Sequence, residues 1–317
     1  MRPFDFSLVT APFRMQPGLR RIAAGTPQLT PSRPGSRHLR EKTAVLASFV
    51  DEALVAVAGF DAAPILTAIA EEAARTDAVA FLHDPTLGES AWRAPLIGWS
   101  VGPHGPQGDG DASLGALLSS LPERLRPTAL LCLAFEDDFA VIEGANATIP
   151  WLAVCLPSRW APETKVGGHF ATVHAPVADN AVLLAAAASL ARLVTGGERW
   201  ERFVWTVSPE VRLHQHPKRL GAAWSDLDGP IDGRAFFRSE RQTFIPLPGT
   251  NQAVFTIHVE TLPLADAVHD ADSAARLHAA IASMSADVLA YKGLGAVRQP
   301  LLAWLGERAT GVGASSR

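Results

Sequence analysis

The sequence predicts an α+β protein built on an antiparallel sheet, and three observations support this class. The segment 236–263 has two runs rich in β-branched and aromatic residues, separated by Pro248-Gly249-Thr250-Asn251, which is typical turn chemistry. Several apolar runs of strand length precede this hairpin, between residues 127 and 177. Helical periodicity is concentrated before and after the strands, which favours segregated helices and strands.

The first third of the chain predicts an extended arm followed by helices. Residues 1–37 are rich in Pro, Gly and Arg and predict an extended N-terminal arm. Helical spacing of apolar residues predicts helices over 40–58 and 63–74, and 78–83 resembles a short strand. The Gly- and Pro-rich stretch 84–111, which contains Trp92, Trp99 and His104, predicts a long loop.

The rest of the chain predicts strands and then helices. Strands are predicted before the hairpin at 129–135, 139–143, 150–155 and 171–177, the last carrying His174. A helix over 181–194 ends at Gly196-Gly197, and a last long helix begins at Ser273 and ends at Lys292-Gly293. Residues 38–309 are therefore expected to form a single domain, followed by a disordered tail at 310–317.

Within the hairpin, the alternation of side chains predicts two different faces. In the second run Ala253, Phe255, Ile257 and Val259 form an apolar face, and the opposite face holds Val254, Thr256, His258 and Glu260. We expect 242–247 to pair with 253–259 and to bury Phe255 and Ile257. The charged first run, Arg238 to Gln242, is either a solvated edge with internal ion pairs or a functional face.

Composition limits the class of protein. The chain has 317 residues, of which 48% are hydrophobic and 19% charged, as in one large globular domain or two closely packed ones. A net charge of −4 without a basic stripe argues against nucleic-acid binding. The first twenty residues lack the apolar segment of a secretory signal, and the longest apolar run, 181–191, is too short to span a membrane. Cys132 and Cys155 lie in apolar runs and predict buried thiols in a reducing cytoplasm.

Several chemistries lack their sequence signatures. The chain contains no Gly-x-Gly-x-x-Gly after a strand, no phosphate loop and no Gly-x-Ser-x-Gly elbow. Its two distant cysteines exclude covalent haem attachment through Cys-x-x-Cys-His and a four-cysteine cluster. His214 and His216 could form a metal pair, but no third ligand stands at a recognisable spacing, so a surface loop is favoured.

Short blocks spread along the chain carry a family resemblance. Within the hairpin they are Glu240-Arg241-Gln242-Thr243, Leu247-Pro248, Phe255-Thr256-Ile257 and Leu262-Pro263-Leu264. Others follow the same order: Phe13-Arg14-Met15, Gly18-Leu19, Pro157-Ser158-Arg159-Trp160, Lys165-x-Gly167, His174-Ala175-Pro176-Val177, Trp205-Thr206 and Tyr291-Lys292-Gly293. Between about residues 13 and 305, the chain thus resembles the haem-dependent oxidative N-demethylase-like family.

The resemblance implies a PAS-like antiparallel sheet with flanking helices that holds a non-covalent haem b. It implies a monooxygenase-type oxidoreductase that demethylates a small secondary or tertiary amine with O2 and releases formaldehyde. Electrons would come from NADPH through a separate reductase subunit, because no nicotinamide or flavin motif is present. Two alternatives are a PAS-like haem sensor of oxygen or redox state and a module that only assembles with partners.

Histidine is the commonest side-chain ligand of non-covalent haem iron. His174 is the first candidate, because its block matches the family; the alternative is a core histidine bonded to backbone. His258 is the second candidate, and the family usually has Arg at this position, so this chain departs from the pattern there. The remaining histidines, His38 and His216 among them, are expected in loops, turns or on exposed helix faces.

Other residues are expected around the haem. Arg241 and Lys165, and with less support Arg238, are candidates to pair with the haem propionates; the alternatives are ion pairs with Glu240 or Glu163. Dry walls would come from Trp160, Trp205 and Phe255, which could equally be plain core. Tyr291 and Lys292, with His258, are the catalytic candidates; the first two either orient substrate or anchor the end of a helix.

Overall fold

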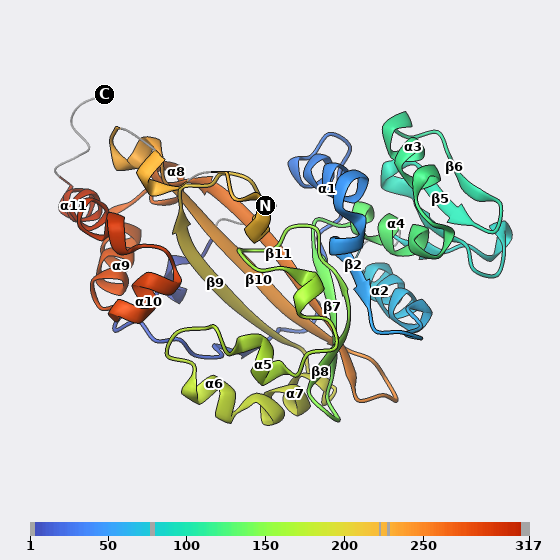
Figure 1. The fold of residues 1–317 in the computed structure, drawn as a ribbon, viewed down its shortest axis with the longest axis horizontal. Helices are drawn as coiled ribbons and strands as arrows, with labels where there is room; N and C mark the ends of the chain where they lie inside the picture. The colour runs from blue at the N-terminus through green and yellow to red at the C-terminus, as the bar shows by residue number, and fades with distance from the viewer. Residues whose placement is uncertain (1–3, 77–79, 222, 227–228, 312–317) are drawn as a thin grey trace.

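The chain is organised around a seven-stranded antiparallel sheet in the computed structural model, which describes residues 4–76, 80–221, 223–226 and 229–311 (Figure 1). The strands follow one another in the order β1 (Arg20–Arg21), β9 (Trp200–Ser208), β10 (Phe236–Pro246), β11 (Gln252–Pro263), β7 (Asp138–Glu143), β8 (Thr148–Ala153) and β2 (Leu54–Ala56). Together with the helices around this sheet, they confirm the α+β class.

The predicted hairpin is confirmed as the centre of the sheet. β10 and β11 pair with Phe244 opposite Phe255 and Gln242 opposite Ile257, within the expected pairing. Ile257 is buried, whereas Phe255 is only half-buried. The face expected to be polar is also covered, because Val254 and Thr256 are fully buried beneath other elements.

Helices α1 (Arg37–Ala53), α2 (Ala63–Thr76), α3 (Ala112–Ser120) and α4 (Arg126–Ala134) share a hydrophobic core with one face of the sheet. This core includes Phe139 and Val141 of β7. The strand predicted at 129–135 is wrong, since this run belongs to α4. Every side chain from Thr128 to Ala134 is buried, so the run shows neither helical nor strand periodicity.

The stretch 84–111 is not a loop, as the sequence predicted, but most of a small antiparallel sheet. Its strands are β3 (Leu82–His83), β4 (Trp92–Ala94), β5 (Trp99–Gly102) and β6 (Gly105–Gly108). Trp92 anchors it by stacking on Phe81, with ring centroids 5.3 Å apart. Strands of two to four residues separated by glycines are too short for a periodic signal. The strand predicted over 78–83 begins at Leu82, and residues 77–79 lie outside the described residues.

The opposite face of the sheet is covered by α5 (Phe170–His174), α6 (Ala181–Ala185) and α7 (Ala187–Thr195) (Figure 1). α5 and α7 pack on the alternate residues of the same strands, Ala140 and Ile142 of β7 among them. The helix predicted over 181–194 is present but is divided at Ala186. The strand predicted over 171–177 is wrong, because Phe170–His174 is a short helix capped by His169.

The C-terminal helices are α8 (Leu264–Ala267), α9 (Ala271–Ala282), α10 (Ala286–Tyr291) and α11 (Arg298–Ala309). The single helix predicted from Ser273 to Gly293 is therefore two helices. Asp270 caps α9, with Ser273 completing a capping box, and Ser285 caps α10. Gly293 ends α10 at φ 68°, as its position predicted. Most of the predicted tail, 312–317, lies outside the described residues.

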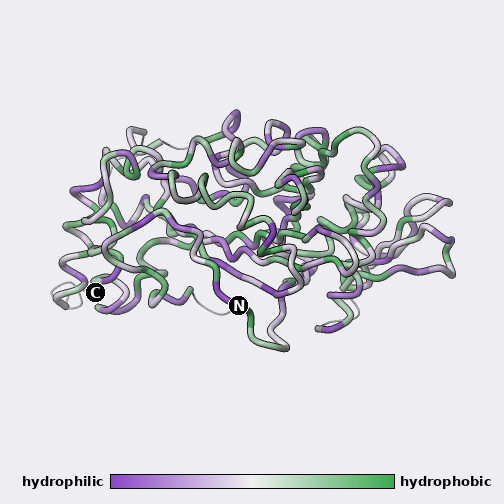
Figure 2. The backbone as a smooth tube through the Cα atoms, turned by 90° about the horizontal axis from the view of Figure 1, so that it is seen from below, coloured by the Kyte–Doolittle hydropathy of each residue, from purple (hydrophilic) through white to green (hydrophobic). Residues whose placement is uncertain are grey.

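Short 3-10 turns complete the described chain: η1 (Phe6–Leu8), η2 (Pro85–Leu87), η3 (Pro95–Ile97), η4 (Glu123–Leu125), η5 (Pro162–Thr164), η6 (Pro217–Arg219), η7 (Trp224–Asp226), η8 (Ile231–Gly233) and η9 (Gly295–Val297). The N-terminal stretch 4–36 is mostly extended, with Phe6 and Val9 packed in the core of α9 and α11. Apolar and polar residues are interspersed along the backbone (Figure 2). Among the described helices, none is both long and apolar enough to cross a bilayer.

The two faces of the sheet differ in how deeply they bury aromatic residues, which gives a test of the packing. Phe139 is fully buried and contacts Phe135, with ring centroids 6.0 Å apart. We expect Phe139→Ala to lower the free energy of unfolding by about 3–5 kcal/mol, the usual range for an emptied core site. Phe255→Ala, at a half-buried site, should cause a smaller loss. Urea denaturation of both variants measures the difference, and an equal loss would contradict this packing.

Candidate functional site

A cavity lies between the sheet and the helices of its second face, with an empty volume of about 330 Å³ that includes open solvent. It is lined by Pro17, Leu19, Ile142, Phe170, Leu190, Ala191, Val194, Arg202 and Phe244. Most of these side chains are apolar, and they come from the N-terminal stretch, β7, β9, β10, α5 and α7. Arg202 is the only charged residue in the lining. The cavity is thus an apolar space with one cation, which suits a largely apolar ligand that carries an anionic group.

His174 lies next to this cavity at the end of α5. Its ring centroid is 4.1 Å from that of Phe170, which lines the cavity. Nδ1 donates a hydrogen bond to the Phe170 carbonyl at 2.8 Å, so in the neutral ring Nε2 keeps its lone pair. No hydrogen bond or ion pair within the described chain involves Nε2. Burial lowers the pKa of His174 to about 4, and the positive charges of Arg202 and Lys165 add to this shift.

Arg202 is the residue that sequence reasoning missed. It points into the cavity from β9, and within the described parts of the chain its guanidinium makes no hydrogen bond or ion pair. Burial lowers the pKa of Arg202, against the opposing effect of Glu240 and Tyr291. A signal was present in the strand pattern, since Arg202 interrupts an aromatic-rich strand just before the Trp205-Thr206 block.

A group of ionisable residues surrounds Arg202. Glu240 accepts hydrogen bonds from Ser158 Oγ and, at 2.6 Å, from Gln242 Nε2. Lys292 donates through Nζ to the Trp205 carbonyl at 2.7 Å, and burial lowers its pKa to about 8 although Glu240 opposes the shift. Burial and the charge of Glu240 raise the pKa of Tyr291. The predicted pair Tyr291-Lys292 therefore belongs to the same electrostatic neighbourhood as the cavity.

The predicted propionate partners are separated by the structure. Lys165 lies beside His174 and donates to the Val173 carbonyl at 3.3 Å. Arg238 is 2% exposed and is fully used by Ser158 and by the carbonyls of Leu156 and Leu213.

Gln242 of β10 pairs with the cavity residue Arg202, so its side chain projects to the cavity side of the sheet. Arg241, the preceding residue, projects to the other side. It forms an ion pair with Glu201 at 2.9 Å and donates to the Pro27 carbonyl. Its partner is thus Glu201 and not Glu240. The side chain of Arg241 therefore does not line the cavity.

The three aromatic candidates also have different surroundings. Phe255 stacks on the cavity residue Phe244, with centroids 4.9 Å apart, and so forms a second layer of the wall. Trp160 is half-buried and contacts the hydrophobic clusters on both faces of the sheet. Trp205 packs instead with Phe237 and Phe13 in the core of the C-terminal helices.

His258 lies on the face of the sheet opposite the cavity. Thr256, two residues before it, meets Thr243 across the hairpin, whereas Phe244 and Phe255 project to the cavity side. Both histidines were expected on strands, but His174 lies on the helix α5, on the other side of the sheet from His258. His258 contacts Glu136, Glu260 and His38 instead.

Two histidines expected at the surface are buried. His38 is 5% exposed because β11 covers this side of α1, and its Nε2 donates to the Val259 carbonyl. His216 is 1% exposed and lies 3.2 Å from Glu163, so the surface-loop prediction is wrong for it. Both thiols, in contrast, are free and buried as predicted.

The depressed pKa of His174 makes stability depend on pH. As the pH falls, the unfolded chain takes up a proton on this ring near 6.5, whereas the folded chain resists protonation until about 4. The contribution of the neutral His174 ring to the free energy of unfolding is therefore fully present above pH 6.5 and is lost as the pH falls toward 4. We expect His174→Gln to show a shallower fall in the free energy of unfolding across this window, measured by urea denaturation. Identical profiles for the two proteins would contradict the burial of His174.

One comparison with known families bears on this site. The family described as haem-dependent oxidative N-demethylase, alpha subunit-like, matches residues 114–302, which is more than half of the chain. The matched region contains His174, Arg202, Glu240 and Lys292, and it begins after the N-terminal stretch and α1. The family is an oxidative, haem-dependent one by its description, in agreement with the resemblance carried by the short blocks. The chain belongs to the haem-dependent oxidative N-demethylase alpha-subunit-like family.

Proposed function

We propose that the protein is a haem enzyme that removes an N-methyl group from a small secondary or tertiary amine, using O2. The observation that carries this proposal is the neutral ring of His174 beside an apolar cavity that contains the guanidinium of Arg202. Neither Nε2 of His174 nor this guanidinium has a hydrogen-bond partner among the described residues. Family membership supports the haem dependence.

The donor set around the cavity fits a haem. A neutral imidazole is the form that ligates iron, and a hydrogen bond from its other nitrogen to a carbonyl is the usual means of orienting such a ligand. His174 has both properties. Arg202, with Lys165 near His174, would hold the propionates, while Phe170 and Phe244 would contact the ring. Because only about 20 Å³ of this space can hold the centre of a water molecule, the pocket must widen when haem enters.

Haem, when bound, supplies the activation of dioxygen. One oxygen atom would enter the N-methyl group, the other would leave as water, and two electrons and two protons would be consumed. The resulting carbinolamine would break its C–N bond to give formaldehyde and the smaller amine. The residues of this chain would contribute an apolar wall that excludes water and a carboxylate, Glu240, that attracts the cationic amine. Lys292, with a pKa of about 8, would hold or release a proton near this carboxylate.

Changing the proposed ligand gives a direct test. We expect His174→Gln to abolish or strongly shift the Soret band of the haem-reconstituted protein, because Gln offers no imidazole nitrogen. His278→Gln, on α9, is a matched control that should keep the band. His258→Gln should also keep it, since His258 lies on the other face of the sheet. A normal spectrum for His174→Gln would exclude this ligand.

The second test concerns the propionate partner. We expect Arg202→Gln to weaken haem binding about 10- to 100-fold, the range for losing a hydrogen bond to a charged group in a buried site. Arg241→Gln is the control, because Arg241 is paired with Glu201 away from the cavity. Haem titration followed by absorbance measures both. If the two variants lose equal affinity, the propionates do not meet Arg202.

The electrons are expected from NADPH through a separate reductase subunit. The alpha-subunit-like description of the family supports the presence of other subunits. The isolated chain should therefore oxidise NADPH slowly, and turnover should appear when a reductase is added. Formaldehyde release measured with and without reductase tests this expectation. Rapid, amine-dependent NADPH oxidation by the chain alone would contradict it.

A further inference from the structure

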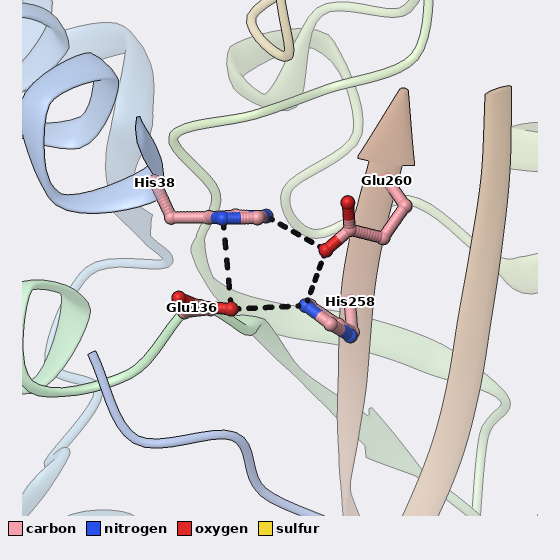
Figure 3. A group of neighbouring side chains, drawn as sticks. All are labelled: His38, Glu136, His258 and Glu260. Carbon is pink, nitrogen blue, oxygen red and sulfur yellow. Dashed lines mark ion pairs between the residues drawn. The ribbon is translucent and has the colours of Figure 1, made fainter. Parts of the chain in front are cut away.

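A second cluster of ligating side chains is buried on the face of the sheet opposite the cavity. His38 comes from α1, Glu136 from the segment before β7, and His258 and Glu260 from alternate positions of β11 (Figure 3). One ligand atom from each of the four lies within 4.8 Å of the others. The side chains are between 6% and 19% exposed. We propose that these four residues bind one Zn²⁺ ion.

The distances within the cluster match a metal site better than a hydrogen-bond network. His258 Nε2 is 3.4 Å from both Glu136 Oε2 and Glu260 Oε1, and His38 Nδ1 is 3.6 Å from Glu136 Oε2. Hydrogen bonds between nitrogen and oxygen are normally about 2.7–3.2 Å long. In a tetrahedral zinc site with bonds of about 2.0–2.2 Å, neighbouring ligand atoms are about 3.3–3.6 Å apart. These three separations therefore have the length of tetrahedral edges. His38 approaches Glu260 through Nε2, at 3.8 Å, so its ring must shift for Nδ1 to complete a tetrahedron.

Two of the ligand atoms have no other partner. His258 Nε2 and Glu260 Oε1 are buried and make no hydrogen bond in the described structure. Buried polar atoms normally find a partner, and both of these point toward the centre of the cluster (Figure 3). His38 is oriented by its Nε2, which donates to the Val259 carbonyl at 2.7 Å and leaves Nδ1 toward Glu136. A bound cation would satisfy the two unpartnered atoms.

The charges of the surrounding residues also favour a dication. Glu136 and Glu260 contribute one carboxylate each to the cluster. The nearby Lys42 forms its ion pair with Asp138, at 3.1 Å, and not with these carboxylates. A divalent ion with two carboxylates and two neutral imidazoles has no net charge, which reduces the free-energy cost of burial. Imidazole ligands favour zinc over magnesium or calcium, which prefer oxygen ligands alone.

The other His/Glu group already has cationic partners and therefore provides a control. Glu52, Glu163 and His216 also come together, but Lys218 contacts both carboxylates and Arg219 pairs with Glu52. These cations already neutralise the group. In the proposed site four protein ligands leave no open position, so zinc there would be structural and would fix α1 and the 136 segment to β11.

The test is zinc binding by the full chain. After treatment with a chelator and desalting, Zn²⁺ alone is added, and bound zinc is counted by elemental analysis while iron is measured separately. We expect one zinc per wild-type chain and a raised melting temperature. Glu260→Gln and His258→Gln should lower zinc affinity at least about tenfold and remove the thermal shift. His216→Gln and Glu163→Gln should behave as wild type.

Each other outcome overturns the proposal. A wild-type chain that binds no zinc would show that the cluster is an ion network with a protonated His258. Undiminished zinc binding by Glu260→Gln and His258→Gln, or its loss in His216→Gln, would place the ion elsewhere. Circular dichroism checks folding, and Glu260→Gln, which keeps the side-chain shape, decides the matter if His258→Gln does not fold. Because the readouts are zinc content and melting temperature, the result does not depend on haem binding.

Discussion

The register between β10 and β11 is the constraint on which the rest of the structure depends. Each position of this hairpin faces one of two different environments, so a slip of one residue would exchange them. Two cross-strand contacts, one on each face of the hairpin, hold this register. They are the hydrogen bond between Thr243 and Thr256 and the stacking of Phe244 on Phe255. The pairing of β9 and β7 on either side fixes it further. The cavity and the His/Glu cluster are thereby kept apart, with a sheet between them.

Buried charges tie the surrounding segments to this hairpin. Arg238 donates to the carbonyls of Leu156 and Leu213, and so joins two irregular segments to β10. Asp138 accepts from the Leu156 amide at 2.6 Å and pairs with Lys42 of α1. Charges this deeply buried are strongly destabilising when one partner is removed. They therefore specify one arrangement of the segments that frame the two sites.

The cavity side and the cluster side use their ionisable groups differently. On the cavity side burial favours the neutral ring of His174, and Arg202 has no hydrogen-bond or ion-pair partner among the residues that the structure describes. On the cluster side the carboxylate neighbours raise the pKa of His258 although burial opposes them, so His258 is matched to negative charge. The two sides of the sheet therefore differ in the protonation state of histidine that they favour.

Local sequence patterns predicted much of the fold of this protein. The hairpin, the helix at 63–74 and the stop at Gly293 were predictable because alternation, helical spacing and turn residues act over a few neighbouring positions. The helix predicted over 40–58 is present but ends at Ala53, because Leu54–Ala56 pairs with β8 as a strand. The short blocks also identified the family. The helical state of α4 and α5 was not predictable, because a fully buried run loses its periodicity and a five-residue helix has little of it. Only the tertiary structure could bring His38 to His258 or turn Arg202 into the cavity, since such contacts depend on how distant elements pack.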